Sequence, residues 1–179
     1  MGITQSTSNN KSNDKTKEII KQIEELTEKR ISNILFDSDK DDWNKDTSVF
    51  IQRILNKKYI IIIIEDEEGN RFGGYVSEKI DKVSRIYDSK SFVFSLESNG
   101  NIEEMMKFDI IQPEYAFKIC NQKDNCLFSF GIGDILVYKE NDKTKSWCYQ
   151  NSFEYEGIEN ALCGKHDFTP KRIIIIEMK

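Results

Sequence analysis

Two runs of isoleucine constrain the fold of this chain more than any other feature. The first lies within residues 59–65 (YIIIIIE). The second comprises residues 173–176 and is followed by Glu177. Each run is too short to span a bilayer and too rich in β-branched side chains to favour a helix. Because continuous β-branched runs tolerate burial on both faces, we expect residues 60–64 and 173–176 to form central strands of a sheet.

The residues that follow the first run predict a hairpin. Residues 68–70 (EGN) are typical of the turn, and residues 99–101 (NGN) carry a second signal that favours antiparallel pairing. Gly73 and Gly74 then begin the next strand. Adjacent glycines in a strand are costly in entropy unless a positive φ or a close approach requires them, so we expect both to be structural.

Helix signals are confined to the first third of the chain. Residues 1–13 are small and polar, which predicts a disordered tail. Apolar residues at helical spacing predict an amphipathic helix over residues 14–33, packed on its own domain or, alternatively, in a short coiled coil between chains. A second helix is expected over residues 42–56, capped by Asp46 or Thr47. Its inward-facing side chains should be Val49, Phe50, Ile54 and Leu55. The sum is an α+β, mainly β fold: a two-sheet antiparallel β-sandwich flanked by a few helices.

Five segments in a particular order carry a resemblance to a known family. They are residues 35–39 (LFDSD), 88–96 (DSKSFVFSL), 130–137 (FGIGDILV), 146–151 (SWCYQN) and 173–177 (IIIIE). With the hairpin between them, their order and spacing resemble the TLDc domain, with residues 34–179 as the TLDc-like unit. The resemblance implies the same β-sandwich, and within it a structural role for Gly73, Gly74, Gly131, Gly133 and Glu177.

The resemblance also implies a function. TLDc proteins are associated with resistance to oxidative stress, and several bind the vacuolar proton pump and regulate its assembly. We therefore expect a non-catalytic interaction module with a protein partner, for which the vacuolar proton-pumping ATPase is the candidate, and no cofactor. The alternative is a cysteine-dependent redox or hydrolytic enzyme.

Composition and charge restrict the partners and the compartment. The chain of 179 residues has a formal net charge of −5, which argues against nucleic acid, because clustered lysine and arginine supply most affinity for its phosphates. No segment could span a bilayer and no secretory signal is visible. We therefore expect a cytoplasmic location in which the four cysteines stay reduced.

The N-terminus fits the acceptor pattern for N-myristoylation. Residues 1–6 read MGITQS, in which Gly2 supplies the amine once Met1 is removed and Ser6 supplies the required hydroxyl. The alternative is a chance match in a tail rich in serine and threonine. One myristoyl chain binds membranes weakly, with a partition constant of ~10⁴ M⁻¹, so we expect weak, reversible association with the cytoplasmic face of a membrane.

The cysteines and the single histidine supply the candidate zinc ligands. These are Cys120, Cys126, Cys148, Cys163 and His166. The first pair is separated by five residues and the other two cysteines are isolated, which does not match the spacing of structural zinc sites. We therefore expect free thiols and no metal. No nucleophile motif surrounds any serine, so His166 is not expected to belong to a hydrolase triad.

Two further motifs invite a binding role. Asp37, Asp39 and Asp41 alternate as in a calcium loop, but the sixth and twelfth positions hold Asp42 and Ser48 instead of glycine and glutamate. We expect a solvated turn between the two helices. Residues 131–134 (GIGD) lack the third glycine of a dinucleotide loop and lie between strands, which favours a bulge or a close strand crossing.

Overall fold

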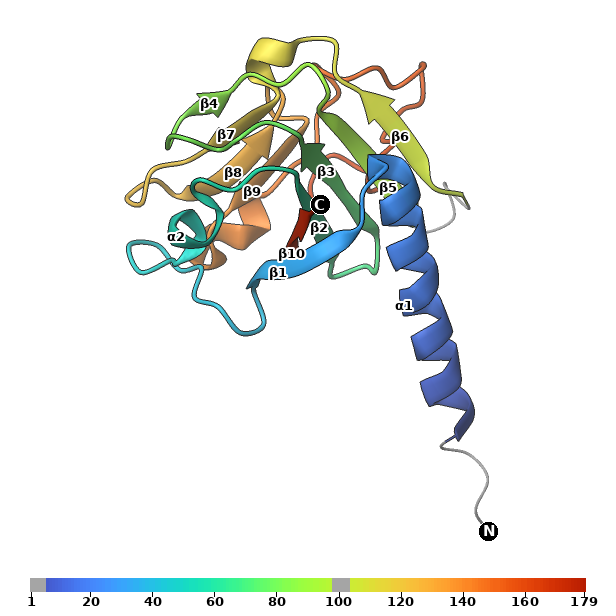
Figure 1. Cartoon of the computed structure of the whole chain (residues 1–179). Coiled ribbons are helices and arrows are strands. Elements are labelled where there is room, and N and C mark those ends of the chain that lie inside the picture. The colour runs from blue at the N-terminus through green and yellow to red at the C-terminus, as the bar shows by residue number, and fades with distance from the viewer. Residues whose placement is uncertain (1–5, 98–103) are drawn as a thin grey trace.

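The computed structural model describes residues 6–97 and 104–179, and its strands form two antiparallel sheets (Figure 1). The six-stranded sheet has the order β1 (Ile31–Asp37), β10 (Pro170–Met178), β2 (Ile60–Asp66), β3 (Arg71–Val76), β5 (Phe92–Glu97), β6 (Met106–Asp109). The four-stranded sheet has the order β4 (Arg85–Ile86), β7 (Phe117–Ile119), β8 (Cys126–Phe130), β9 (Ile135–Tyr138). Beside them lie α1 (Ser6–Thr27), α2 (Phe50–Ile54) and two 3₁₀ turns, η1 (Pro113–Tyr115) and η2 (Glu140–Lys145). The predicted two-sheet, mainly β fold is confirmed.

The isoleucine runs form β2 and β10, which pair with each other inside the six-stranded sheet. Ile62 lies opposite Ile175, and both are fully buried between the sheets. Ile61 and Ile176 point to the other face and are also buried, against α1 and the side chains beside it. Because side chains alternate along a strand and both faces are covered, an unbroken β-branched run is accommodated. The prediction of central strands is confirmed.

The space between the sheets is filled mainly by aromatic rings. Phe128 of β8 stacks on Phe50 of α2, with ring centroids 5.4 Å apart, and Phe117 lies 5.0 Å from Phe130. All four rings are buried. The predicted hairpin joins β2 to β3 through residues 67–70, with Gly69 at φ +88°. The second predicted turn, at residues 99–101, falls outside the described residues.

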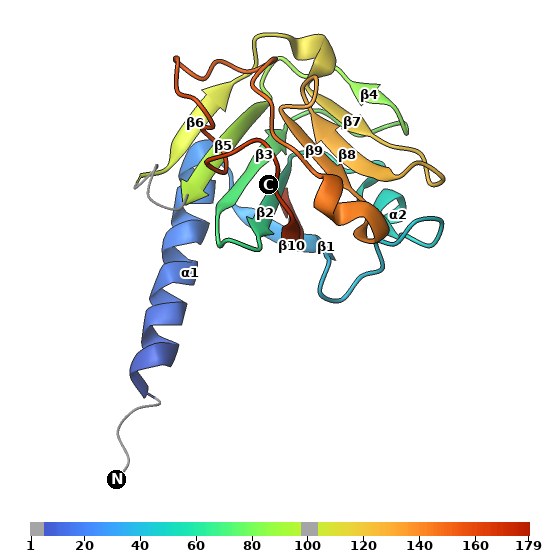
Figure 2. The same ribbon diagram turned by 180° about the vertical axis from the view of Figure 1, so that it is seen from behind.

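Helix α1 covers part of the outer face of the six-stranded sheet. Ile23 is 1% exposed and packs with Ile61, while Ile19 and Leu26 are partly buried beside it. This confirms the interpretation of a helix packed on its own domain. Figures 1 and 2 show that the N-terminal part of α1 continues well beyond the sheet.

The predicted bounds of the first helix were wrong at both ends. The helix ends at Thr27, Glu28 takes the left-handed conformation (φ 54°), and Ile31–Asp37 becomes the edge strand β1. Strand β1 was missed because its pairing with β10 is a long-range contact, which helical periodicity in the sequence does not reveal. At the other end the structure places residues 6–13 in the helix, where a tail was expected. Extending a formed helix costs little per residue.

The second predicted helix is reduced to one turn and a half. Asp46 has a positive φ of 69°, which ends any helix through residues 42–49. The Phe50 N–H donates to Ser48 Oγ (3.2 Å), so neither Asp46 nor Thr47 caps α2. The expected inward side chains are confirmed, since Phe50 and Ile54 are buried in the core and Val49 and Leu55 pack against it.

Candidate functional site

The glycine–aspartate turn is built around a buried carboxylate. Asp134 accepts hydrogen bonds from the Asn151 and Ser152 N–H groups (2.9 Å each) and from the Tyr155 hydroxyl (2.9 Å). Burial raises the pKa of Asp134 above its ordinary value. Gly131 and Gly133 have positive φ and connect β8 to β9. An added Cβ at Gly131 would lie 2.0 Å from Asp134 Oδ2, so this turn accommodates Asp134 and leaves little room for a nucleotide phosphate.

The two glycines of β3 lie where neighbours approach closely. A Cβ at Gly73 would lie 1.8 Å from the Ile62 carbonyl oxygen, and one at Gly74 would lie 2.5 Å from Phe130 Cζ. Neither has a positive φ, so close approach is the reason for both. Glu177, the end of the second isoleucine run, pairs with Lys57 at 3.5 Å. Gly2 lies outside the described residues.

The acidic cluster in the first third of the chain holds an ion pair. Asp37 is 3% exposed and accepts hydrogen bonds from Arg172 Nη2 (2.8 Å) and Nε (3.1 Å). This contact holds the pKa of the Asp37 carboxyl below its ordinary value. The expected solvated turn is therefore wrong for Asp37, because β1 brings it beside the arginine of β10. Across residues 6–97 and 104–179, no cluster of three or more metal-ligating side chains is present.

The structure does not bring the five candidate zinc ligands together at one place. Cys120 and Cys126 form a disulfide at the end of the β7–β8 hairpin, so the expectation of four free thiols is wrong. Their spacing, unsuitable for zinc, brings two facing residues of the hairpin together, with Cα atoms 5.8 Å apart. Cys148 and Cys163 are buried free thiols, and a hydrogen bond from Cys148 lowers the pKa of Cys163. His166 is exposed, with its ring edge-on to Tyr149 at 5.2 Å.

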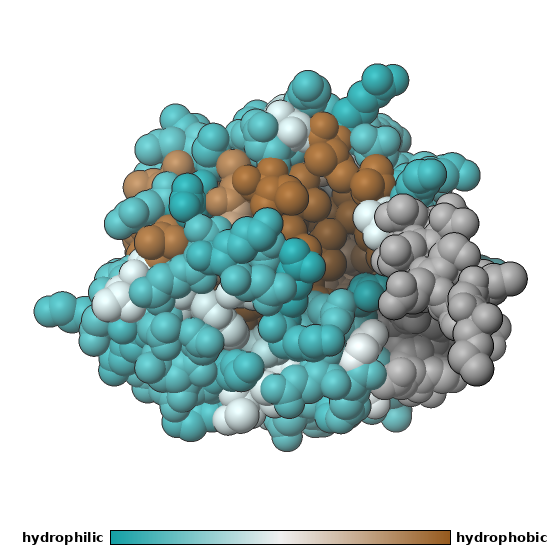
Figure 3. Space-filling view, turned by 90° about the horizontal axis from the view of Figure 1, so that it is seen from below, coloured by the Kyte–Doolittle hydropathy of each residue, from teal (hydrophilic) through white to brown (hydrophobic). Residues whose placement is uncertain are grey.

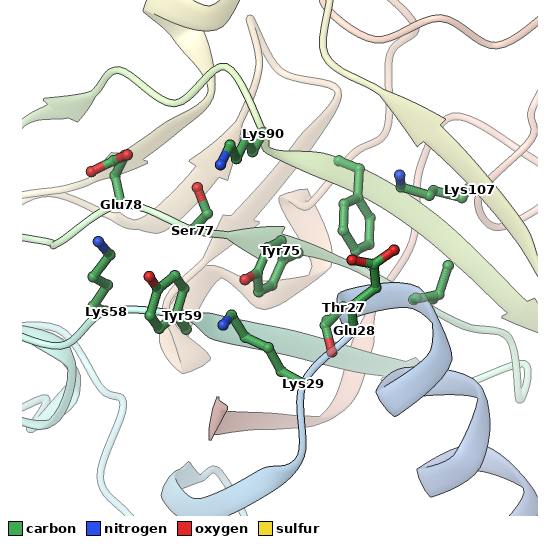
Figure 4. Close-up of a pocket in the computed structure, with 12 residues that line it drawn as sticks. Thr27, Glu28, Lys29, Lys58, Tyr59, Tyr75, Ser77, Glu78, Lys90 and Lys107 are labelled. Atoms are coloured by element: carbon green, nitrogen blue, oxygen red, sulfur yellow. The ribbon is translucent and has the colours of Figure 1, made fainter. Parts of the chain in front are cut away.

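A hollow rich in lysine lies on the outer face of the six-stranded sheet, at the C-terminal end of α1 (Figure 4). We call it the lysine hollow. Its volume is about 430 Å³, and its cationic side chains come from four separate segments: Lys29, Lys58, Lys90 and Lys107. Aromatic side chains also line it, namely Tyr59, Tyr75 and Phe92. The sequence offered no pattern for this site, because folding alone brings these residues together.

The rings and the ammonium groups of the lysine hollow are in contact. The Lys29 and Lys58 ammonium nitrogens lie 3.8 and 4.7 Å from the centre of the Tyr59 ring. Tyr75 is 5% exposed and stacks on Phe92, with centroids 5.0 Å apart. Burial raises the pKa of the Tyr75 hydroxyl, and the neighbouring Asp88 carboxylate raises it further. Tyr75 therefore remains a neutral hydrogen-bond donor at physiological pH.

A second hollow, the isoleucine groove, lies between α1 and the β1–β10–β2 side of the same sheet face. Its volume is about 340 Å³, and eight isoleucines form its apolar lining: Ile19, Ile20, Ile23, Ile31, Ile34, Ile63, Ile174 and Ile176. Ile34 is 62% exposed, and Arg172 and Glu65 form the polar rim. Figure 3 shows an apolar patch, in brown, on the face of the molecule seen from below. The described helices include none long and apolar enough to cross a bilayer.

Comparison with known proteins places the whole fold in one family. The sequence model of the TLDc domain matches residues 5–173, from the start of α1 into β10. A search among curated proteins gives no match. Because the matched residues make up most of its length, the chain belongs to the TLDc domain family.

Proposed function

We propose that this chain is a non-catalytic TLDc-type interaction module. The observation that carries the proposal is the outer face of the six-stranded sheet, which a single helix covers only in part. Two hollows remain open there, one apolar and one cationic. Exposed apolar surface beside polar rim residues is typical of protein-binding surfaces.

The buried carboxylates are engaged in the fold, which agrees with this proposal. Asp88 accepts from the Ser77 N–H (2.6 Å), the Ser77 hydroxyl (2.7 Å) and the Lys90 N–H (2.9 Å). Asp66 accepts from Asn70 through both N–H and side-chain amide. Each of these buried carboxylates accepts hydrogen bonds that organise a turn.

Family membership supports a protein partner and its class. The resemblance to TLDc proteins points to the vacuolar proton-pumping ATPase and to protection from oxidative stress. A myristoyl group on Gly2 would add weak, reversible recruitment to the cytoplasmic face of the membrane that carries the pump. The projecting part of α1 would then separate the membrane from the folded domain (Figure 1).

The test uses two matched variants of exposed isoleucines. Ile34 lines the isoleucine groove and is 62% exposed, whereas Ile111 lies outside both hollows and is 56% exposed. Ile34→Asp should reduce the co-purification of pump subunits from native cells several-fold, and Ile111→Asp should not. Both variants should keep the wild-type melting temperature within a few degrees. Equal recovery of pump subunits with all three proteins, or recovery with none, would contradict the proposal.

The alternative is an enzyme that uses a cysteine, and one observation favours keeping it. Cys148 and Cys163 lie side by side as free thiols, with the Cys163 pKa lowered by its neighbour. A thiol-reactivity profile separates the two proposals. One thiol that reacts far faster than a denatured control would support the enzyme, and two slow, buried thiols would support the interaction module.

A further inference from the structure

We propose that the lysine hollow binds a phosphorylated polyol, either as a soluble molecule or as the head group of a lipid. The hollow lies at the C-terminal end of α1, whereas the isoleucine groove is lined by the preceding turns of the helix, from Thr16 to Ile23. The inference therefore goes beyond the proposed protein partner and does not depend on it.

The hollow gathers four cationic donors. In the part of the chain that the structure describes, no carboxylate pairs with the ammonium groups of Lys29, Lys58 or Lys90. Lys107 pairs with the exposed carboxylate of Asp109 (2.8 Å). Four ammonium groups from four segments repel one another, while contacts of three of them with the Tyr59 and Phe92 rings stabilise the arrangement in the free chain. A bound anion would offset that repulsion.

The hydroxyl of Tyr75 is a hydrogen-bond donor at the border of the hollow. Tyr75 is 95% buried, yet its hydroxyl has no hydrogen-bond partner among the described residues and borders the hollow. Figure 4 shows this hydroxyl pointing toward Tyr59 and the Lys29 ammonium group, with Lys90 farther away. The hydroxyl oxygen itself is not among the buried, unpaired side-chain atoms of the described residues, so it is open to the hollow and can donate to a ligand there.

The remaining lining explains why the ligand should be a polyol. Glu28 and Glu78 also border the hollow, and their carboxylates would repel a bare phosphate but accept hydrogen bonds from hydroxyl groups. A volume of about 430 Å³ suits a ligand of this size.

Backbone strain is concentrated at the same place. Glu28 and Tyr59 both have left-handed conformations, with φ of 54° and 56°. For residues other than glycine this conformation is unfavourable, and it is enriched at functional sites. Here it lets Glu28 end α1 at the hollow and presents the Tyr59 ring to Lys29 and Lys58.

The test measures binding by the purified full-length chain with two probes. The soluble probe is inositol hexakisphosphate, followed by calorimetry, and the lipid probe is a phosphatidylcholine vesicle containing phosphatidylinositol bisphosphate. The double variant Lys58→Glu/Lys90→Glu should weaken binding by at least about tenfold, because it reverses two ligand-facing charges. The control Lys82→Glu/Lys123→Glu alters the net charge equally, at exposed lysines outside the hollow, and should stay within about twofold of wild type.

A third variant separates a built site from general surface charge. Tyr75→Phe removes only the hydroxyl that borders the hollow and keeps the stack on Phe92, so affinity should fall several-fold without a loss of thermal stability. Binding of the soluble probe alone would assign the site to soluble phosphorylated polyols, and binding of vesicles as well would assign it to lipid head groups.

Three results would overturn the proposal: no binding of either probe at low salt, equal losses in the two double variants, or binding of a phosphoserine peptide but of neither probe. Loss of pump co-purification in Ile34→Asp would leave these measurements unchanged, so the two proposals fail independently.

Discussion

The two faces of the six-stranded sheet are made by the same strands but differ in what covers them. On the inner face, Ile60, Ile62 and Ile64 are sealed by the second sheet and its phenylalanines. On the outer face, Ile61 is buried whereas Ile63 borders an open groove, because only α1 lies above them. Identical side chains on one strand are therefore core or surface according to the neighbouring element. The inner face is closed by the second sheet, and part of the outer face stays exposed in two hollows.

Neighbouring isoleucines on β2 give the strongest test of this difference. Ile62→Asp should leave the chain unfolded, because an unpaired charge in the core costs several kcal/mol out of a total stability of ~5–15 kcal/mol. Ile63→Asp should remain folded with a lower melting temperature, since its carboxylate can reach water through the isoleucine groove. Circular dichroism melts of both variants provide the measurement. Equal loss of structure would show that the outer face is as closed as the inner one.

The contact between the sheets can be tested at Gly74. Gly74→Ala would place a methyl group 2.5 Å from Phe130 Cζ, and overpacking of this kind costs about 1–3 kcal/mol. Phe130→Leu removes the obstructing ring atoms, so the double variant should be less destabilised than the sum of the two single variants. Urea denaturation of the four proteins measures the coupling. Strict additivity would mean that β3 does not press on β8 at this point.

An acid titration tests the rim of the outer face. The Arg172 guanidinium holds the pKa of Asp37 below its ordinary value, so the ionised carboxylate adds stability above the unfolded-state pKa, near 4. That contribution is lost as the pH falls through the lower folded value. Asp37→Asn should therefore cost about 1 kcal/mol at pH 7 and progressively less below about pH 4.

The control for that titration is Asp81→Asn, at an exposed position. Its free energy of unfolding should match that of the wild type both at pH 7 and below about pH 4. A penalty for Asp37→Asn that does not change with pH would indicate lost packing and no role for the charge.

The smallest expected effect on the domain is at Gly2. Co-expression with an N-myristoyltransferase should give a product without Met1 that carries one acyl group, and Gly2→Ala should prevent it. The variant should shift partly from membrane to soluble fractions while the melting temperature of the domain stays the same. Intact mass and cell fractionation are the readouts. An unmodified or acetylated N-terminus in the native cell would remove lipid recruitment from the proposed function.

Local patterns in the sequence predicted the central strands and the turn between β2 and β3. They failed for elements whose structure depends on residues far away in the sequence. The isoleucine runs and the turn at residues 67–70 carry their structure in neighbouring residues, so their prediction is confirmed. Strand β1 forms because its backbone pairs with the edge of β10. The helical spacing of its apolar residues therefore led to a wrong prediction. The disulfide was missed because residue spacing was compared with zinc sites and not with the two sides of a hairpin.

The sequence by itself determined the mainly β class, the central strands and the family, because the spacing of apolar residues and the order of segments are properties of the linear sequence. Only the tertiary structure decided which face stays open and which side chains gather there. Lys29 and Lys107 are far apart in sequence, and nothing around either one marks a shared site. They meet because α1 ends over the sheet beside β5 and β6. The candidate sites are thus set by how the helix covers the sheet, which depends on long-range packing.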